Sequence, residues 1–540
     1  MRGTLVRPVT ADRTRLSLAT GERAQLVARW AAVIALLGAL VPIGVYIWIA
    51  AHRLDFPYEL DWMEGGAVEL VGRVVHGQSL YTSPTLAYVS YTYPPLYTWV
   101  SAALAEITGL GFLPLRLVSF GSSLIAIWTL WRWVFTATGD RIAGAVGAGL
   151  FAACYGLTGW WFDVGRLDSM YVALALLALW LGRGARGVRA GMGVGALAFL
   201  AFFTKQTALV VVVPALVWLA LARPRAGLTA LAVLGAAVAG STLLMDALTN
   251  GWYRYYVVDE LAGQAWQPRE WGAFWRVDLY RHLRPLVWLL AVALAVSAVG
   301  AWHSRGELRD RLRGELRLRR SLPRPRGDRL SFGYELAAAA GLVLAAWFSR
   351  LHTGGYVNVL MPAYAGCALL GGLAFARLRA LAPAATLLAV ALVLLQLIGL
   401  MTLPNHALPA GAERRAGNEL ISRLRSLPGP VLVLDHPWYG TLAGKGSFAQ
   451  SDAITEVLRS AAPRGRTDLT RALAGALDRY RIQAVVLDHA PRSWLAGQLA
   501  HQFVLESQPV TPLRLRPPAD IRAWPEYLYV RRSAAAANRT

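Results

Sequence analysis

Hydrophobic positions along the chain fall in long uninterrupted runs, and short polar stretches separate them. Runs of roughly 18 or more apolar residues can cross a bilayer as helices. The pattern therefore predicts an α-helical polytopic membrane protein with about eleven transmembrane helices, of which the fourth and fifth are the shortest. The expected ranges are 27–50, 112–131, 142–160, 169–182, 190–203, 206–222, 227–248, 284–302, 332–349, 358–376 and 383–402.

The overall composition agrees with this pattern. The 540 residues are 56% hydrophobic and 16% charged, whereas soluble domains carry about 25% charged residues. A net charge of +22 would suit nucleic-acid binding, but much of the basic excess lies where the positive-inside rule needs it. We therefore expect no nucleic-acid partner. Both cysteines, Cys154 and Cys367, lie in apolar runs, which predicts neither a disulfide framework nor a zinc site.

One further apolar stretch, 93–111, opens with Tyr-Pro-Pro and carries Glu106. We interpret it as an interfacial or re-entrant helix. If it crossed the membrane, every later loop would change sides, and the arginine-rich run 304–329 would face outward, against the positive-inside rule. The sequence thus predicts a cytoplasmic tail at 1–26, a transmembrane domain at 27–402, and outer loops at 51–111, 160–169, 249–283 and 349–362.

The chain changes character after the last apolar run. Two β-branched runs, "GPVLVLDHPW" and "IQAVVLDHA", follow helical patterns at 411–427 and 467–480, and "EYLYVRR" comes near the end. Such alternation indicates a small α/β domain. We therefore predict that residues 403–540 form an extracytoplasmic α/β domain.

The first outer loop contains the densest group of acids, in "YELDWMEGG" at 58–66. We expect a helix that begins near Asp61 and ends at Gly77, which would place Asp61 and Glu64 on one face. In one interpretation the acids are solvated and keep the loop outside. In the other they converge with Glu59 and with nearby aromatic residues such as Tyr93, a combination that is common in carbohydrate sites.

Three other outer segments carry ionisable residues at the mouths of spans, where such groups are functional candidates. Arg166 and Asp168 form either a local pair, with Asp168 as a helix N-cap, or part of a binding site. Lys205 either reaches out to water or holds a phosphate as a point charge. These segments are "DVGRLDSMY", "FFTKQTAL" and "RLHTGGYVNVL".

The last of these segments places Arg350 and His352 before two glycines, with Asn358 just after them. Adjacent glycines allow a ligand to approach the backbone, and an Arg–His pair suits a lipid phosphate. A flexible turn explains the glycines equally well. The aromatic loop 249–283 is either a lid over a substrate or an interfacial helix.

Several motifs of soluble enzymes and ATPases are absent from the sequence. It contains no G-x-x-x-x-G-K-[ST], no H-E-x-x-H and no G-x-S-x-G. An ATP-driven transporter is therefore not expected.

Taken in order, the motifs "GQSLY", "YPPLY", "GRLDSMYVALALLAL", "FFTKQTALVVVVPAL" and "GGYVNVLMPAYA" resemble those of GT-C glycosyltransferases. These polytopic enzymes take a sugar from a polyprenyl-phosphate carrier. They include bacterial aminoarabinose transferases and protein O-mannosyltransferases. The resemblance covers residues from about 50 to 400.

The resemblance implies a role for the acids. In the family an acid of the first loop is the catalytic base, often within a D-x-D, E-x-D or D-E pair. Glu59 and Asp61 form an E-x-D here, while Glu64 matches the Glu of the D-E form, with Met63 in place of its Asp. The resemblance favours Asp61, then Glu64, as the base. Lys205 and Arg350 match positions where relatives place basic groups near the carrier phosphate.

The resemblance also implies an inverting transfer to a glycan, lipid or protein acceptor at the bacterial inner membrane, with the site and the C-terminal domain outside the cytoplasm. A divalent ion such as Mg²⁺ or Mn²⁺ is optional. Two other classes stay open: a transporter or flippase of a lipid-linked glycan, which needs ionisable groups near the membrane midplane, and a non-catalytic membrane scaffold.

Overall fold

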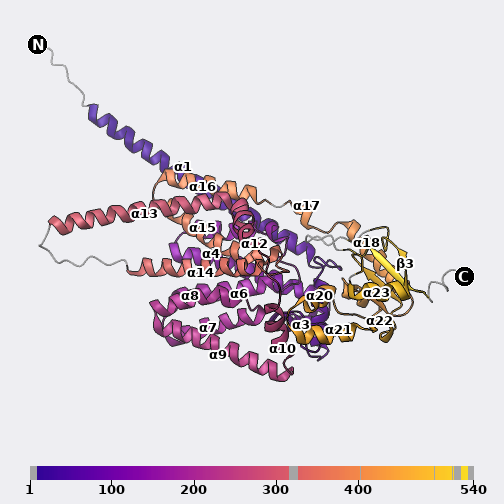
Figure 1. The fold of residues 1–540 in the computed structure, drawn as a ribbon. Helices are drawn as coiled ribbons and strands as arrows, with labels where there is room; N and C mark the ends of the chain where they lie inside the picture. The colour runs from indigo at the N-terminus through magenta and orange to yellow at the C-terminus, as the bar shows by residue number, and fades with distance from the viewer. Residues whose placement is uncertain are drawn as a thin grey trace, which may run out of the picture.

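The computed structural model describes residues 9–314, 326–401, 403–491, 493–513, 515 and 524–532. Most of them are helical. A helical bundle forms one part of the molecule and a small mixed domain covers one end of it (Figure 1). The long helices of the bundle are α1 (Val9–Arg53), α4 (Phe112–Thr138), α5 (Arg141–Ala153), α6 (Asp168–Gly184), α7 (Gly187–Thr204), α8 (Ala208–Ala222), α9 (Pro224–Leu248), α13 (His282–Gly314), α14 (Arg326–Arg350), α15 (Met361–Arg379) and α16 (Pro383–Gly399).

The apolar helices make this an integral membrane protein. Within the described ranges, eight helices are long and apolar enough to cross a bilayer, and α8 and α16 are apolar but shorter. The 17-residue α6 belongs to neither group. Each of the eleven predicted ranges lies largely on a helix, but the number of spans stays a prediction.

Small residues let the central helices pack closely. The apolar windows of α5 and α15 are both 78% buried, whereas that of α9 is 11% buried and faces outward. A Cβ atom added at Gly149 of α5 would lie 2.4 Å from the carbonyl oxygen of Ala39 in α1. Close backbone approach at small residues is the usual way in which membrane helices associate.

The loop at 51–111, which is predicted to lie outside, contains two short helices. α2 (Glu64–Val75) is followed by Gly77, which has a φ of +68°, and α3 (Leu96–Thr108) is not among the helices long enough to span. The prediction that α2 begins near Asp61 is wrong by three residues. Asp61 forms the preceding turn, because its carboxylate accepts the N–H of Met63 at 3.1 Å.

The segment between α9 and α13 lies over the same end of the bundle as the mixed domain. It contains α10 (Trp252–Arg254), the π-helix η2 (Tyr255–Asp259), α11 (Glu260–Ala262), α12 (Glu270–Ala273) and the π-helix η3 (Phe274–Arg281). Much of the arginine-rich run 304–329 lies outside the described residues, since 315–325 are not described.

Residues beyond α17 (Pro404–Ala407) form a four-stranded sheet with helices around it. The strand order is β1-β2-β4-β3, with β1 parallel to β2 and the other two pairs antiparallel. The strands are β1 (Val431–Val433), β2 (Ala484–Leu487), β3 (Phe503–Ser507) and β4 (Tyr527–Arg531). The helices are α18 (Gly411–Ser426), α19 (Pro437–Leu442), α20 (Ser451–Arg459), α21 (Pro463–Leu473), α22 (Ala476–Arg479) and α23 (Ser493–Gln502).

The domain that contains this sheet shares its apolar core with the loop at 51–111. Phe56, Leu60 and Tyr91 of the loop belong to the same buried cluster as Leu432 and Val485 of the sheet. The domain therefore packs on the loop as one unit rather than standing apart from it.

Candidate functional site

A buried ion pair fixes the first loop to the bundle. Arg116 of α4 binds Glu64 through two parallel hydrogen bonds, from Nε to Oε1 at 3.0 Å and from Nη2 to Oε2 at 2.7 Å. The same carboxylate accepts the N–H groups of Leu60 at 2.7 Å and Gly165 at 2.6 Å. Every accepting direction of Glu64 is thus used.

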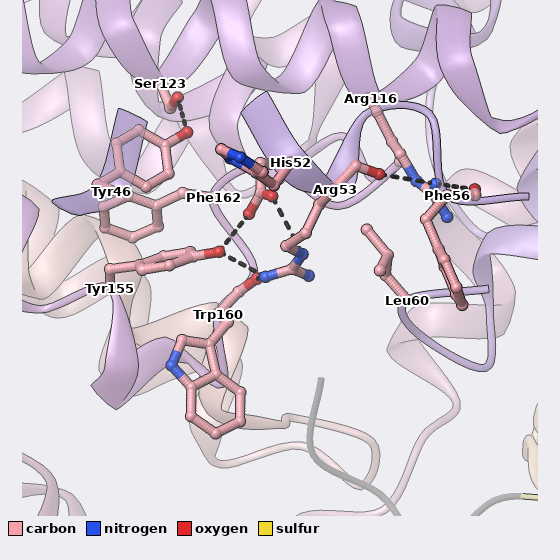
Figure 2. A network of polar contacts seen from close by, with 12 residues as sticks. Tyr46, His52, Arg53, Phe56, Leu60, Arg116, Ser123, Tyr155, Trp160 and Phe162 are labelled. Carbon is pink, nitrogen blue, oxygen red and sulfur yellow. Dashed lines mark hydrogen bonds and ion pairs between the residues drawn. The ribbon is translucent and has the colours of Figure 1, made fainter. Parts of the chain in front are cut away.

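The remaining N–H groups of Arg116 donate to backbone carbonyl groups of the loop. Arg116 binds the carbonyl oxygens of Arg53, Phe56 and Tyr58 at 3.1, 2.6 and 2.6 Å. Figure 2 shows the contacts with Arg53 and Phe56. We call Glu64, Arg116 and these three carbonyl groups the Arg116 clamp. Both charged side chains are 0% exposed. The clamp is a complete structural unit without a free polar atom for a substrate.

A second buried network lies beside the clamp, also drawn in Figure 2. Arg53 pairs with Asp163 at 3.3 Å and donates to the hydroxyl group of Tyr155, which in turn donates to Asp163 at 2.7 Å. This network ties the end of α1 to the loop after α5. It occupies Asp163, so that acid is engaged in holding the scaffold.

Asp61 is also buried, but unlike Glu64 it is not fully hydrogen-bonded. Its Oδ2 accepts only the Met63 N–H, and in the part of the chain that the structure describes its Oδ1 has no hydrogen-bond partner. The side chain is 0% exposed. An unsatisfied buried carboxylate oxygen is costly, and such atoms often mark places where a substrate supplies the missing partner.

Arg166 provides the matching unsatisfied cation. Its Nε and Nη1 atoms are buried and lack partners among the described residues. The guanidinium carbon lies 5.4 Å from the ring centre of Tyr91, 5.9 Å from that of Tyr93 and 5.6 Å from that of Trp161. Arg166, Tyr91 and Tyr93 line one cavity. Asp61 does not line this cavity, but the charge of Arg166 acts on its pKa. We call Asp61, Arg166, Tyr91, Tyr93 and Lys205 the Asp61 pocket.

Lys205 joins this group through an ion pair. Its Nζ lies 2.6 Å from Asp168 Oδ1 and 5.6 Å from the ring centre of Tyr93. Asn358 donates to the other oxygen of Asp168 at 3.2 Å. The sequence-based alternative that pairs Asp168 with Arg166 as a helix cap is wrong, because Leu167 occupies the cap and Asp168 binds Lys205.

The electrostatics separate the three acids of the loop. Burial raises the pKa of Asp61 well above its usual value, and the nearby Arg166 offsets this only in part. Burial also acts on Glu64, but Arg116 and the hydrogen bonds outweigh it and keep that pKa below its usual value. Burial raises the pKa of Glu59 to about 7 despite its contact with His436. A raised pKa makes an ionised carboxylate a stronger proton acceptor, whereas a lowered pKa suits a permanent anion.

Glu59 faces away from the Asp61 pocket, toward the C-terminal domain. Its Oε2 pairs with His436 Nδ1, and its backbone N–H donates to Tyr439 at 3.2 Å. A Cβ atom added at Gly65 would lie 2.0 Å from Glu59 Oε1. The helix backbone therefore closes off the second oxygen of Glu59, which argues against its acting as the base.

Arg350 and His352 lie apart from these groups and hold the segment between α9 and α13. Arg350 pairs with Asp278 at 3.0 Å and Glu270 at 3.5 Å. His352 packs against Trp266 with ring centres 4.3 Å apart and the two ring planes tilted by 40°. Both side chains predicted to contact a phosphate are thus engaged with the protein itself.

A metal site receives no support from the geometry. Among the residues that the structure describes, no group of three or more His, Cys, Asp or Glu side chains could hold an ion. Participation of Mg²⁺ or Mn²⁺ stays a prediction.

Sequence reasoning missed the partners that decide these roles. Arg116 interrupts an apolar run in "FLPLRLVSF", which was a detectable signal, because an arginine at a span is rarely without function. Asp163, Tyr91 and His436 gave weaker signals. The pairing of His436 with Glu59 joins residues 377 positions apart, and no local pattern predicts such a contact.

Two kinds of comparison place the chain among known proteins. Residues 92–245 match the family model described as dolichyl-phosphate-mannose-protein mannosyltransferase. No curated protein sequence matches the chain. Among solved structures, ArnT from Cupriavidus metallidurans bound to undecaprenyl phosphate is similar, with 15% identity, a TM-score of 0.52, and coverage of 91% of this chain and 97% of that chain.

Weaker structural similarity extends to two further solved structures. ArnT from the same organism in the apo state has a TM-score of 0.45 at 16% identity, covering 91% of this chain and 97% of that one. The archaeal oligosaccharyltransferase AglB from Archaeoglobus fulgidus has a TM-score of 0.44 at 12% identity, covering 85% and 69%. The family match and the ArnT fold confirm that this chain resembles the GT-C glycosyltransferases.

Proposed function

We propose that the protein is a membrane glycosyltransferase that moves a sugar from a polyprenyl-phosphate carrier to an acceptor. The observation that carries the proposal is that an Asp61 carboxylate oxygen and two Arg166 guanidinium nitrogens are buried without hydrogen-bond partners among the described residues, while the charge of Arg166 acts on the pKa of Asp61. A reaction that releases a phosphate and a proton needs one group of each kind. Similarity to a transferase bound to undecaprenyl phosphate supports the choice of carrier.

In the proposed reaction the acceptor hydroxyl or amine attacks the anomeric carbon of the donor sugar. The bond from that carbon to the phosphate oxygen breaks, and its electron pair stays on the phosphate. Asp61 Oδ1 takes the acceptor proton, a step that typically contributes 10²–10⁴-fold to rate. Attack opposite the leaving phosphate inverts the anomeric centre.

Arg166 and Lys205 stabilise the charge that develops on the leaving phosphate. Arg166 offers donors that nothing in the described protein uses, held in place by aromatic rings on three sides. Lys205 contributes a point charge, while Asp168 and Asn358 hold its position. Preorganised cations of this kind are worth about 10²–10³-fold in rate.

The remaining assignments extend the proposal to the whole chain. Residues 27–402 form the transferase domain, with 51–111 as its catalytic loop, and 403–540 form an extracytoplasmic domain. The N-terminal tail, 1–26, lies in the cytoplasm of a bacterium and the protein spans its inner membrane. The acceptor is a glycan, lipid or protein of the cell envelope. Arginine enrichment in the loops of one side supports this orientation.

The test is release of polyprenyl phosphate by the purified protein in lipid nanodiscs. A panel of polyprenyl-phosphate sugars is supplied together with a membrane-lipid extract as the acceptor source. Wild type should release the carrier and form a new glycosidic bond, and Asp61→Asn should lose at least about 10²-fold of that rate. Movement of lipid-linked sugar across vesicles without bond formation would support the transporter alternative. Equal rates for wild type and Asp61→Asn would overturn the assignment of the base.

A further inference from the structure

The C-terminal domain grips the loop segment that carries Asp61. From this we propose that the domain is part of the catalytic centre, and that His436 acts through Glu59 as a positioning residue for Asp61. The claim that His436 contributes to catalysis rests on the proposed function. The claim that the C-terminal domain holds residues 58–62 does not depend on it.

His436 lies between two carboxylates that come from different parts of the molecule. Nδ1 binds Glu59 of the first loop, and Nε2 lies 2.9 Å from Asp488 Oδ2, just after β2. The ring stacks on Tyr439 with centres 5.2 Å apart and an interplanar angle of 19°. An imidazolium that donates from both nitrogens binds one oxygen of each acid at once, while Glu59 Oε1 and Asp488 Oδ1 have no hydrogen-bond partner among the described residues. The histidine is 1% exposed, so water does not compete for these bonds.

Two further side chains near Asp61, those of Tyr58 and Trp62, also form hydrogen bonds with the C-terminal domain. Tyr58 donates to Asn418 of α18 at 2.5 Å, and Trp62 donates through its indole nitrogen to Asp452 of α20 at 2.5 Å. Together with the Glu59–His436 contact, the C-terminal domain binds the side chains on both flanks of Asp61. Asp61 itself feels the charge of Arg166, which partly offsets the rise in its pKa that burial causes.

Two consecutive glycines make this arrangement possible. A Cβ atom at Gly65 would lie 2.0 Å from Glu59 Oε1, and one at Gly66 would lie 1.9 Å from the Tyr91 hydroxyl oxygen. Helix α2 can thus lie directly against both side chains only because these positions lack a side chain. The "EGG" motif of the loop and the "LDH" motif of the domain therefore both contribute to the contact between Glu59 and His436.

A domain that served only to bind an acceptor or a partner would need no such contacts. Buried charged groups are expensive, and apolar packing alone would dock two surfaces at less cost. Here the charged contact falls two residues from the proposed base. Because a displacement of about 1 Å can cost about 10²-fold in rate, holding this segment is a direct contribution to catalysis.

The chain offers a matched control for the test. The tripeptide Leu-Asp-His occurs at 434–436 and again at 487–489, and His489 is exposed whereas His436 is buried. We would compare His436→Gln with His489→Gln in the full-length protein in nanodiscs. Hydrogen–deuterium exchange of residues 58–66 reports how firmly the segment is held. Carrier release then gives kcat and the KM for the donor lipid.

We expect His436→Gln to raise exchange in 58–66 and to lower kcat about tenfold to 10²-fold, with the donor KM within about threefold of wild type. His489→Gln should match wild type in both measurements. Gly65→Ala places a Cβ atom 2.0 Å from Glu59 Oε1 and 3.1 Å from the Trp438 side chain of α19. By displacing Glu59 it should reproduce the effect of His436→Gln. It also serves if His436→Gln does not fold.

The two measurements separate the inference from the proposed function. If no donor is turned over by wild type, the function fails, while raised exchange in His436→Gln alone still supports the gripping of the segment. Unchanged exchange in His436→Gln and Gly65→Ala would overturn the inference whatever the activity. Raised exchange with a wild-type kcat would reduce His436 to a structural contact and would also overturn it.

Discussion

Two acids of the first loop lie three residues apart and are buried to the same extent, yet the molecule treats them in opposite ways. Glu64 in the Arg116 clamp has every lone-pair direction filled. In the part of the chain that the structure describes, one oxygen of Asp61 and two nitrogens of Arg166 are buried without a hydrogen-bond partner. Burial alone therefore does not distinguish a structural acid from a reactive one.

The difference lies in hydrogen-bond satisfaction. A saturated carboxylate is held as an anion and cannot accept a proton without losing several bonds. A buried carboxylate that lacks hydrogen bonds lowers the stability of the folded protein, and a bound substrate that supplies the missing hydrogen bond offsets this cost. The clamp provides the rigidity that keeps the neighbouring pocket in this unfavourable state.

Breaking the clamp should give the largest effect. Arg116→Met leaves the Glu64 carboxylate buried and unpaired, which typically costs about 3–5 kcal/mol of folding stability. We expect a large drop in the folded fraction on heating in detergent, measured by size-exclusion chromatography. The double variant Arg116→Met, Glu64→Gln should recover part of the loss. A single variant as stable as wild type would show that the pair is not a clamp.

Removing the cation of the pocket should affect rate and spare stability. Arg166→Gln takes away donors that have no partner in the described protein, so folding loses little. Carrier release should fall about 10²-fold, equivalent to about 2.7 kcal/mol in the barrier. A loss of melting temperature that matched the loss of rate would place Arg166 with the structural groups instead.

The contact between the loop and the C-terminal domain should weaken as pH rises. Burial raises the pKa of Glu59 to about 7. Burial alone would lower the pKa of His436, but Asp488 and Glu59 outweigh it and raise that pKa well above its usual value. The pKa of Asp488 is also raised, chiefly by burial. The neighbouring Asp435, which accepts the Asp488 N–H, further raises the pKa of Asp488, and His489 lowers it. Glu64 further raises the pKa of Glu59.

All three raised values have the same consequence for stability. The folded protein binds more protons here than the unfolded chain, so unfolding free energy falls as pH rises from about 5 through 7 and beyond. Each excess proton is worth roughly 1.4 kcal/mol per pH unit. Melting temperatures from pH 5 to 9 should decline more steeply for wild type than for Glu59→Gln. Parallel curves for the two proteins would contradict this account of the contact.

The smallest effect should come from replacing His352, which lies outside both the Arg116 clamp and the Asp61 pocket. His352→Ala removes the ring contact with Trp266, worth about 0.5–1.5 kcal/mol, and leaves both the clamp and the pocket intact. Donor KM and kcat should each change less than tenfold in the carrier-release assay. A larger loss of kcat would mean that the segment from α10 to η3 takes a direct part in the reaction.

Sequence reasoning predicted much of the fold and only part of the site. Long apolar runs located the helices of the bundle, and the motifs around 93–97, 165–171 and 202–216 indicated the right structural class. The structure brings Asp61, Arg166, Lys205 and Tyr93 together, as their shared outer position suggested. It separates Arg350 and His352 from them, because acids and an aromatic ring of the segment after α9 take up both side chains.

What the sequence could not distinguish was the state of each acid. Asp61 and Glu64 look alike in "ELDWMEGG", and only distant partners set them apart. Arg116 approaches from a different helix, and Gly165 donates from a loop about a hundred residues later. Such contacts arise from tertiary packing, and periodicity carries no information about them.

The most direct test compares Asp61→Asn with Glu64→Gln in two measurements, the melting temperature and the rate of polyprenyl-phosphate release per folded molecule. We predict that Asp61→Asn melts at or above the wild-type temperature and loses at least about 10²-fold in rate. Glu64→Gln should melt lower, yet its folded molecules should keep a rate within about tenfold of wild type. The reverse result, an active Asp61→Asn and a stable but inactive Glu64→Gln, would contradict the account and make Glu64 the base.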